Sequence, residues 1–392
     1  MENLSFSTLC VHAGTRIDPI TEGVNTPIYT STSYPYLDTD DRPYPRYFNL
    51  PNQKSVIEKL IFLEGCDLDT SDGILFSSGM AAISTTLLGL LASGDHVLFQ
   101  RGLYGGTTNF ISGWLKKYGI EWSYPASNDP EAFEEAIRPT TRMVYIETPS
   151  NPLLGITDME SIARIAKRYR LISVIDSTFA SPVNQNPRSL GIDIVIHSAT
   201  KYLGGHSDIS AGAIIAPKEV IKPIYRMALN LGGSLNPETC YLLERSMKTL
   251  AIRVEKQNQN TMEVALFLAQ HPAVSRVFYP GLPSHPGHAI AKKQMRGFGG
   301  MLSFELRSAD PVKFQKSLKL IRPSMSLGGV DSIICSPVMT SHRHLSREEL
   351  DKEGITDKVL RLSVGIEDAT DIIHDLKQAL EIGRASCRER VS

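Results

Sequence analysis

The sequence lacks the features of several large protein classes. Lys plus Arg number 41 and Asp plus Glu number 42, so no excess charge would attract a nucleic acid or an anionic membrane. No apolar run approaches the roughly 20 residues that cross a membrane, and no secretory signal is visible. The five cysteines include no Cys-x-x-Cys pair, which predicts neither a disulfide framework nor a zinc ribbon. We expect a soluble, cytoplasmic protein with reduced cysteines.

Common enzyme motifs are missing as well. The sequence holds no GxGxxG after a strand, no GxxxxGK[ST], no HExxH and no GxSxG, which argues against a nicotinamide-dependent enzyme, a P-loop nucleotidase, a zinc protease and an α/β-hydrolase. His342 and His344, in the motif SHRH, have no further ligand at a metal-binding spacing. We expect these histidines to be ordinary surface residues and expect no metal site.

The 392 residues have an ordinary globular composition, with 42% hydrophobic and 21% charged residues, and the length suggests two or three domains. Residues 1–50 are rich in Pro, Tyr, Thr and Asp without sustained helical periodicity, and predict an extended arm. Apolar strand patterns alternate with helical patterns over 51–236, which predicts an α/β domain with a doubly wound, mostly parallel sheet. Residues 237–382 predict a smaller α+β domain, and 383–392 resemble a non-native or disordered tail.

A lysine with small and hydroxyl neighbours follows one of the predicted strands. The motif SATKYLGGHSD (198–208) comes directly after the apolar run IDIVI, and ligands bind beyond the carboxyl ends of strands in open α/β sheets. Lys201, next to the hydroxyls of Ser198 and Thr200, therefore suits a nucleophile that forms a Schiff base beside a phosphate. A solvated surface lysine is equally compatible with this motif alone.

Two further features lie at similar positions in the predicted fold. Asp176 closes the strand LISVID, where a carboxylate needs a partner such as a pyridinium nitrogen, although a turn or capping role fits as well. The motif SSGMAA (77–82) opens a helical pattern, so Ser78 and Gly79 lie at an anion site or at a simple helix cap. Together the three features supply the parts of a pyridoxal-phosphate site.

The chain resembles the Cys/Met-metabolism family of pyridoxal-phosphate enzymes, which includes cystathionine γ-synthase, cystathionine β- and γ-lyases and methionine γ-lyase. The resemblance runs from residue 8 to about residue 382. It rests on TPIYTSTSY (26–34), SSGMAAI (77–83), LYGGT (103–107), ETPSNP (147–152), SATKYLGGHSD (198–208), SLGGVDS (326–332) and RLSVGIED (361–368). The resemblance implies an α/β fold of the aspartate aminotransferase type (fold type I), with a large doubly wound domain and a small C-terminal α+β domain.

The resemblance also implies roles for single residues. Lys201 would hold pyridoxal 5′-phosphate and move protons, Asp176 would pair with the pyridine nitrogen, and Tyr104 would stack on the ring. Further cofactor contacts are expected from Ser78, Gly79, Met80, Asn151, Ser198 and Thr200. Substrate contacts are expected from Arg361, which would clamp the α-carboxylate, and from Ser326, Asn151 and Asp331.

The arm has a role in this resemblance. Tyr44 and Arg46 match the family's Tyr-x-Arg, which reaches the phosphate of the neighbouring subunit. A homotetramer is therefore expected, as a dimer of dimers with active sites shared across the dimer interface. The sequence departs from the usual family pattern at Leu50, an insertion in the arm motif, at Asp331, where γ-enzymes often have Glu, and at Gly106, where a methionine γ-lyase typically has Cys.

The resemblance favours a trans-sulfuration carbon–sulfur lyase, which performs β- or γ-elimination on cystathionine or a similar thioether amino acid. The alternative is γ-replacement on an O-acylated homoserine, as in a cystathionine γ-synthase. An aminotransferase would need a second arginine for a distal carboxylate, and no family motif here supplies one. A cofactor-binding regulator would need an added DNA-binding module, for which the chain has no room. We expect a small amino-acid substrate and no nucleic-acid or membrane partner.

Overall fold

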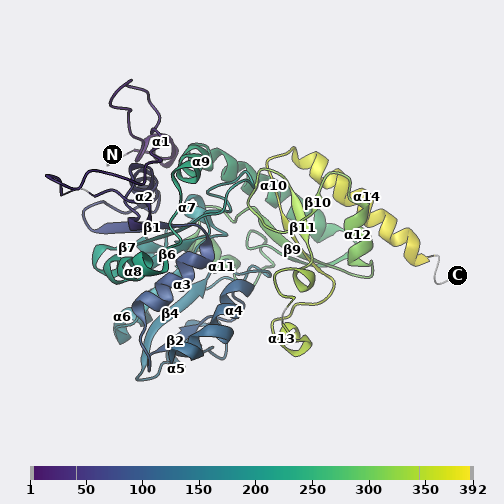
Figure 1. Ribbon diagram of the computed structural model, residues 1–392. Helices are drawn as coiled ribbons and strands as arrows, with labels where there is room; N and C mark the ends of the chain where they lie inside the picture. The colour runs from purple at the N-terminus through teal and green to yellow at the C-terminus, as the bar shows by residue number, and fades with distance from the viewer. Residues whose placement is uncertain (1–3, 41, 344, 389–392) are drawn as a thin grey trace.

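The computed structural model describes residues 4–40, 42–343 and 345–388. These residues form a seven-stranded sheet with its helices and a smaller five-stranded sheet with its own (Figure 1). The α/β fold class expected from the sequence is confirmed. No helix in the described ranges is both long and apolar enough to cross a membrane.

The larger sheet is mixed, with mostly parallel pairs. In sheet order its strands are β1 (Ser71–Phe76), β7 (Gly212–Pro217), β6 (Ile194–His197), β5 (Ile172–Asp176), β4 (Thr141–Glu147), β2 (His96–Phe99) and β3 (Glu121–Ser123). Strand β7 runs antiparallel to both of its neighbours, whereas β6, β5, β4, β2 and β3 run parallel. The sequence predicted strands at 96–100, 143–147, 172–176, 193–197 and 212–216, which correspond to β2, β4, β5, β6 and β7, whereas β1 and β3 were not predicted.

Helices cover both faces of this sheet. Side chains that alternate along the strands therefore belong to different hydrophobic clusters, one set on each face. Side chains such as Phe76, Phe99 and Tyr145 pack under α3 (Gly79–Leu90) and α8 (Lys218–Leu231). The opposite face packs against α2 (Pro51–Leu63) and α6 (Met159–Tyr169). Shorter helical segments of this half are η1 (Pro45–Tyr47), α4 (Gly105–Trp114), η2 (Leu115–Tyr118), α5 (Pro130–Glu135), α6 (Met159–Tyr169), α7 (Ser181–Asn184) and η3 (Pro187–Leu190).

The smaller sheet is built from the C-terminal part of the chain. Its order is β10 (Arg322–Pro323), β11 (Ile333–Cys335), β12 (Val359–Ser363), β9 (Met301–Leu306) and β8 (Val274–Phe278). Side chains of this sheet share a core with α10, α12 and the long α14, which Figure 1 shows as the yellow helix that ends at the C-terminus. The helical segments here are α10 (Leu250–Gln270), α11 (His288–Gln294), α12 (Pro311–Ser317), η4 (Pro337–Met339), α13 (Arg347–Lys352) and α14 (Ala369–Arg388).

The structure differs from the sequence-based elements in three places. The segment predicted as an extended arm contains a helix, α1 (Phe6–His12), whose buried Cys10 carbonyl accepts a hydrogen bond from Lys59 Nζ at 2.9 Å. The sequence pattern predicts one long helical stretch from Pro237 to about Gln270, but the structure has two helices there, α9 (Pro237–Met247) and α10, separated at Lys248–Thr249. Helix α14 continues past residue 382 to Arg388, and the rest of the predicted tail, 389–392, lies outside the described residues.

The inserted Leu50 begins helix α2 (Pro51–Leu63). Its side chain is fully buried, and its backbone N–H donates to Gln53 Oε1 at 2.9 Å. The Gln53 amide in turn donates to the carbonyl of Leu235 at 2.9 Å. The insertion therefore fixes the start of α2 and the chain that leads into it.

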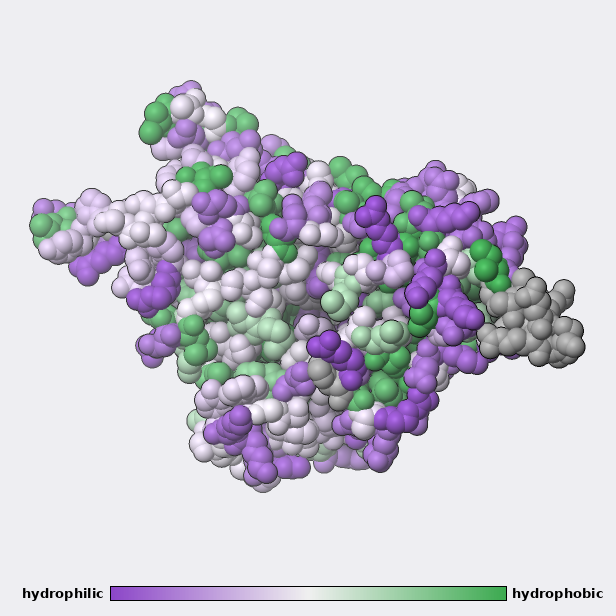
Figure 2. Space-filling model, turned by 45° about the vertical axis from the view of Figure 1, so that its right-hand side comes forward, coloured by the Kyte–Doolittle hydropathy of each residue, from purple (hydrophilic) through white to green (hydrophobic). Residues whose placement is uncertain are grey.

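Parts of the arm project from the body and carry apolar side chains. Figure 2 shows two such projections at the upper left, each with hydrophobic (green) residues on it. The most exposed large apolar side chains among the described residues of this segment are Ile17, Ile20, Val24, Tyr36 and Leu37, which are 66 to 88% exposed. Such surface is costly in water and is typical of a segment that packs against another molecule.

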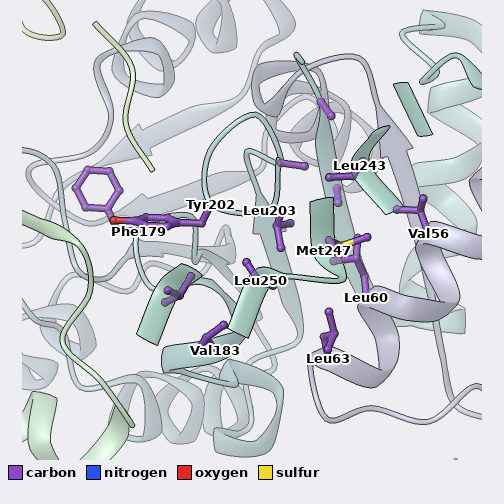
Figure 3. Close-up of a cluster of buried hydrophobic side chains, with 14 of the residues drawn as sticks. Val56, Leu60, Leu63, Phe179, Val183, Tyr202, Leu203, Leu243, Met247 and Leu250 are labelled. Carbon is purple, nitrogen blue, oxygen red and sulfur yellow. The ribbon is translucent and has the colours of Figure 1, made fainter. Parts of the chain in front are cut away.

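A buried cluster supports the turn that carries Lys201. Figure 3 shows Tyr202 and Leu203, the two residues after this lysine, together with Leu60 of α2, Met247 of α9 and Leu250 of α10. All five side chains are almost completely buried. The position of the turn is therefore fixed by three helices at once.

Candidate active site

One cavity gathers most of the candidate residues. It has a volume of about 500 Å³ and lies where the carboxyl ends of β4, β5 and β6 meet loops of the smaller domain. The predicted residues that line it are Ser78, Gly79, Met80, Tyr104, Gly106, Asn151, Asp176, Ser198, Thr200, Lys201, Ser326 and Arg361. Binding pockets for small molecules are of this size.

Lys201 reaches into this cavity from the turn after β6. Its Nζ donates a hydrogen bond to Ser326 Oγ at 2.9 Å. Ser326 has a left-handed backbone, with φ of 86°, which is uncommon for a residue with a side chain. Burial, with a further contribution from the Arg361 charge, lowers the pKa of Lys201 to about 8. The lysine therefore carries a much larger fraction of nucleophilic free amine than an exposed lysine does at neutral pH.

Two carboxyl groups close neighbouring strands at the bottom of the cavity. Glu147 ends β4 and Asp176 ends β5, and the two residues are directly paired in the sheet. Burial raises the pKa of both carboxyl groups, and the charge of Asp176 raises the pKa of Glu147 further. The Asp176 carboxylate accepts a hydrogen bond from the backbone N–H of Thr178 at 3.0 Å. A cation placed beside Asp176 would stabilise its ionised form.

Glu147 was not assigned a role from the sequence, although it closes its strand as Asp176 does. Its carboxylate accepts the backbone N–H of Tyr104 at 2.8 Å and the backbone N–H of Asn151 at 3.0 Å. One buried side chain thus holds the two loops that bring Tyr104 and Asn151 to the cavity. The strand-end position was the sequence signal that could have identified it.

The start of α3 forms a second part of the wall. Ser78 caps this helix by accepting the backbone N–H of Ala81 at 3.1 Å. The N–H groups of the first residues have no partner within a helix and carry its positive end. A side chain at Gly79 would collide with Ser198, so glycine allows the helix end to approach the turn that carries Lys201.

Arg361 lies on β12 and is only 5% exposed. Its guanidinium donates to Asn151 Oδ1 at 2.8 Å and to the carbonyl of Ser326 at 3.2 Å. These two contacts fix the plane of the guanidinium inside the cavity. A planar fork held in this way suits a carboxylate.

Some expected site residues lie elsewhere. Tyr44 and Arg46 do not line the cavity of their own chain, since Arg46 donates to the carbonyl of Leu229 at 2.7 Å and lies over the rings of Tyr44 and Tyr47. Asp331 is exposed and does not line the cavity either.

The local chain path accounts for the position of Asp331. The chain turns through left-handed residues at Ser326 and Gly328, which brings Ser326 and Leu327 to the cavity. The backbone at Val330 and Asp331 then packs against Gly365. Asp331 therefore lies outside the cavity of its own chain, and a substrate contact from it stays a prediction.

The expectation that His342 is a surface residue is wrong. The side chain is only 2% exposed, and its Nδ1 lies 2.8 Å from Ser341 Oγ. Burial and the nearby Arg361 charge lower the pKa of His342 to about 4, so the imidazole is neutral at physiological pH. The second histidine of this motif, His344, lies outside the described residues.

The geometry agrees with a comparison against protein families. Residues 7–381 match the family described as Cys/Met metabolism PLP-dependent enzyme. The chain belongs to this family. Its relatives include cystathionine γ-lyase of Bacillus subtilis (strain 168), which is 43% identical over 95% of this chain and 98% of that protein. Cystathionine β-lyase MetC of the same strain is 41% identical over 98% and 99% of the two chains.

A relative whose name gives a different reaction is almost as similar. Cystathionine γ-synthase of Mycobacterium leprae is 40% identical over 95% of this chain and 96% of that protein. Among solved structures, cystathionine γ-lyase from Lactobacillus plantarum has a TM-score of 0.93 and 38% identity over 97% of this chain and 100% of that chain. The predicted family and fold type are therefore confirmed, while the relatives divide between lyases and a synthase.

The cavity of this Cys/Met-metabolism enzyme fits pyridoxal phosphate. The N-terminus of α3 and the hydroxyls of Ser198 and Thr200 line one end, as an anionic phosphate requires. The buried Asp176 carboxylate would be stabilised in its ionised form by a neighbouring cation such as a protonated pyridine nitrogen. Lys201 supplies an amine for a Schiff base. The family requires the same cofactor, so the enzyme is dependent on pyridoxal phosphate.

Proposed function

We propose that this enzyme is a carbon–sulfur lyase that cleaves cystathionine or a similar thioether amino acid. The observation that carries the proposal is the placement of Lys201, Asp176 and Arg361 around one cavity. Pyridoxal-phosphate chemistry on an α-amino acid needs three groups at one place: an amine, an acidic partner for the cofactor, and a guanidinium that binds the substrate carboxylate.

The residues would share the work as follows. Pyridoxal phosphate supplies a carbonyl group for the substrate amine and a ring that accepts the electron pair left at Cα. Arg361, fixed by Asn151 and Ser326, holds the substrate α-carboxylate. Lys201 Nζ, whose pKa near 8 permits both protonation states at physiological pH, removes the Cα proton.

The second carboxyl group has a positioning role in this proposal. Glu147 holds the backbone of Tyr104 and Asn151. The Tyr104 ring is thereby kept at the cavity, where it would stack on the cofactor, and Asn151 is kept against Arg361. A change at Glu147 would therefore disturb cofactor and substrate contacts together.

The proposed reactions consume one water per cystathionine. Elimination at Cβ gives homocysteine, pyruvate and ammonia, and elimination at Cγ gives cysteine, 2-oxobutyrate and ammonia. Gly106 supports such a thioether over methionine, because it brings no thiol where a methionine γ-lyase typically has Cys. Replacement on an O-acylated homoserine remains the alternative.

Product analysis of the loaded enzyme tests this proposal. With cystathionine as substrate, we expect homocysteine or cysteine together with the matching keto acid, and a kcat/KM at least about tenfold above that for methionine, or roughly 1.4 kcal/mol. Faster turnover of methionine would contradict the proposal. If cystathionine is not cleaved but cysteine is consumed with an O-acylated homoserine, the synthase replaces the lyase.

We propose further that the enzyme is a homotetramer built from two dimers with shared active sites. The arm supports this, since its exposed apolar side chains need a cover and Tyr44 and Arg46 lie outside the cavity of their own chain. The proposed arrangement places both residues in the phosphate site of the partner. The expected cytoplasmic location stays a prediction.

Subunit mixing tests the shared site. An Arg46→Ala variant mixed with a Lys201→Ala variant should regain partial activity, because one site of each mixed dimer combines both intact residues. The matched control is Arg361→Ala mixed with Lys201→Ala, since both residues line the same cavity of one chain and no site becomes complete. Recovery in the control alone, or in neither mixture after confirmed exchange, would contradict the shared site.

A further inference from the structure

A second arginine lines the cavity. Arg343 lies between η4 and α13, in a segment whose Thr340 and Ser341 also line the cavity. Unlike Arg361, which is deeply buried, Arg343 is exposed. The cavity therefore has one arginine inside and another on a loop that reaches solvent.

The segment that carries Arg343 is held firmly. The backbone N–H of His342 donates to the carbonyl of Pro337 at 2.9 Å, and Thr340 Oγ1 donates to the carbonyl of Ser336 at 2.7 Å. The His342 imidazole is buried next to Arg361, whose charge lowers the pKa of that imidazole. The residue immediately before Arg343 is thus anchored beside the proposed α-carboxylate site.

Helix α4 supports the same segment from the other side. The Ser341 carbonyl packs so closely on Gly105 that any side chain at residue 105 would collide with it. Gly105 is the neighbour of Tyr104, which also lines the cavity. The loop is therefore seated between Arg361 and the start of α4, and the position of Arg343 follows from these contacts.

We propose that Arg343 binds a carboxylate at the far end of the substrate. This inference rests on the proposed function and names the substrate class of the same site. A substrate held by Arg361 through its α-carboxylate extends toward the exposed part of the cavity, where Arg343 meets its distal end. A guanidinium recognises a carboxylate by two parallel hydrogen bonds, which an apolar tail cannot form.

The substrate class is a thioether amino acid that ends in a carboxylate. Cystathionine belongs to this class because its distal end is a second amino acid, whereas methionine ends in a methyl group. Arg343 thus supplies a contact to the distal carboxylate, whereas Asp331, expected from the sequence to contact the substrate, lies outside this cavity.

Paired substrates test this inference. S-(3-carboxypropyl)-cysteine and S-butyl-cysteine differ mainly in the terminal carboxylate, and the matching homocysteine pair reports γ-elimination. We expect Arg343→Ala to reduce the kcat/KM preference for the carboxylate-ended member about tenfold, and Arg343→Lys to keep part of it. Arg322→Ala is the matched control, since Arg322 is exposed on β10 and does not line the cavity.

A binding measurement gives the same test without turnover. In a Lys201→Ala background, calorimetry should show that adding Arg343→Ala weakens cystathionine binding about tenfold and changes S-butyl-cysteine binding much less. An unchanged preference, equal weakening for both ligands, or no binding of cystathionine would overturn the inference. If the unmodified enzyme cleaves none of these thioethers while the binding difference is present, the proposed lyase reaction fails and Arg343 retains its role.

Discussion

The cavity has two walls that are built differently. The sheet wall consists of the start of α3, the end of β5 and the turn after β6, with Asp176, Ser198 and Lys201. The loop wall consists of residues on connections of the smaller domain, namely Met325, Ser326, Leu327, Thr340, Ser341 and Arg343. The sheet wall is fixed by strand pairing and by the buried clusters beneath it. The loop wall depends on single hydrogen bonds and on close packing against Gly105.

This difference separates the two tasks of the enzyme. Chemistry that the whole family shares needs a fixed lysine, carboxylate and anion site, and the rigid strand ends supply them. Selection among leaving groups needs side chains that can vary without disturbing the cofactor, and loops tolerate such variation. Substitutions in the sheet wall should therefore lower kcat/KM for all substrates. Substitutions in the loop wall should instead change the ratio of kcat/KM between substrates.

The largest expected effect is at Lys201. Lys201→Ala removes the amine that would bind the cofactor and move the Cα proton, so kcat should fall about 10⁴-fold or more for every substrate. The fold should persist, because the cluster around Tyr202 and Leu203 does not include the lysine. Steady-state kinetics and a melting curve measure both quantities. A loss of kcat for one substrate only would contradict the proposal that the sheet wall serves the chemistry of all substrates.

Arg361 should give the next largest effect. Arg361→Lys keeps the charge but loses the planar fork and the paired contacts to Asn151 and Ser326. We expect kcat/KM to fall about 10- to 100-fold for all amino-acid substrates, mainly through KM, as for the loss of a hydrogen bond to a charged group. Equal losses for cystathionine and methionine are the check, and a change in their ratio would count against the proposed α-carboxylate role.

The pKa of Lys201 predicts how cofactor uptake depends on pH. Attack on the cofactor needs the free amine, whose fraction rises with pH until the pKa near 8 is passed. The rate of covalent loading of the cofactor-free protein should therefore rise about tenfold per unit below that pH and level off above it. In Arg361→Ala the levelling should move to higher pH, because the arginine charge no longer lowers the lysine pKa. An identical profile in both proteins would contradict this coupling.

Substitutions at the neighbouring glycines Gly105 and Gly106 should have the smallest effects on activity. Comparing the two tests whether the loop wall depends on its contact with Gly105. A methyl group at Gly106 meets the Tyr104 ring and the Met80 sulfur, which can move, whereas one at Gly105 meets the Ser341 backbone. We expect Gly106→Ala to lower kcat about threefold with little change in melting temperature, as for a small repacking. Gly105→Ala should displace the loop wall and reduce the preference for cystathionine. An equal change in the preference for cystathionine from both substitutions would contradict the close contact between Gly105 and the Ser341 carbonyl.

The sequence predicted the sheet wall more accurately than the loop wall, for physical reasons. Asp176 ends an apolar strand and Lys201 follows another, and the carboxyl ends of parallel strands meet at one edge, so local patterns placed both residues at that edge. Their roles came from the family resemblance, because each local pattern alone also fitted a structural role. Glu147 closes its strand in the same way but carries backbone contacts that no local pattern reveals.

The loop wall depends on packing between segments that are distant in the chain. His342 was expected at the surface because no further metal ligand lies at a suitable spacing, yet its imidazole is buried and its segment packs against Gly105. Asp331 was expected to contact the substrate because it matches a position where γ-enzymes often have Glu, but the chain passes through left-handed residues at Ser326 and Gly328 and leaves Asp331 exposed outside the cavity. The second arginine, which no family motif supplied, became visible only through this packing.

The most direct test of the account is to identify the residue that binds the cofactor. The loaded enzyme is reduced with borohydride, digested, and its labelled peptide is sequenced by mass spectrometry. The account predicts a single label on Lys201, the lysine that reaches the cavity beside Asp176 and Ser326. A label on any other lysine would contradict the assignment of both walls.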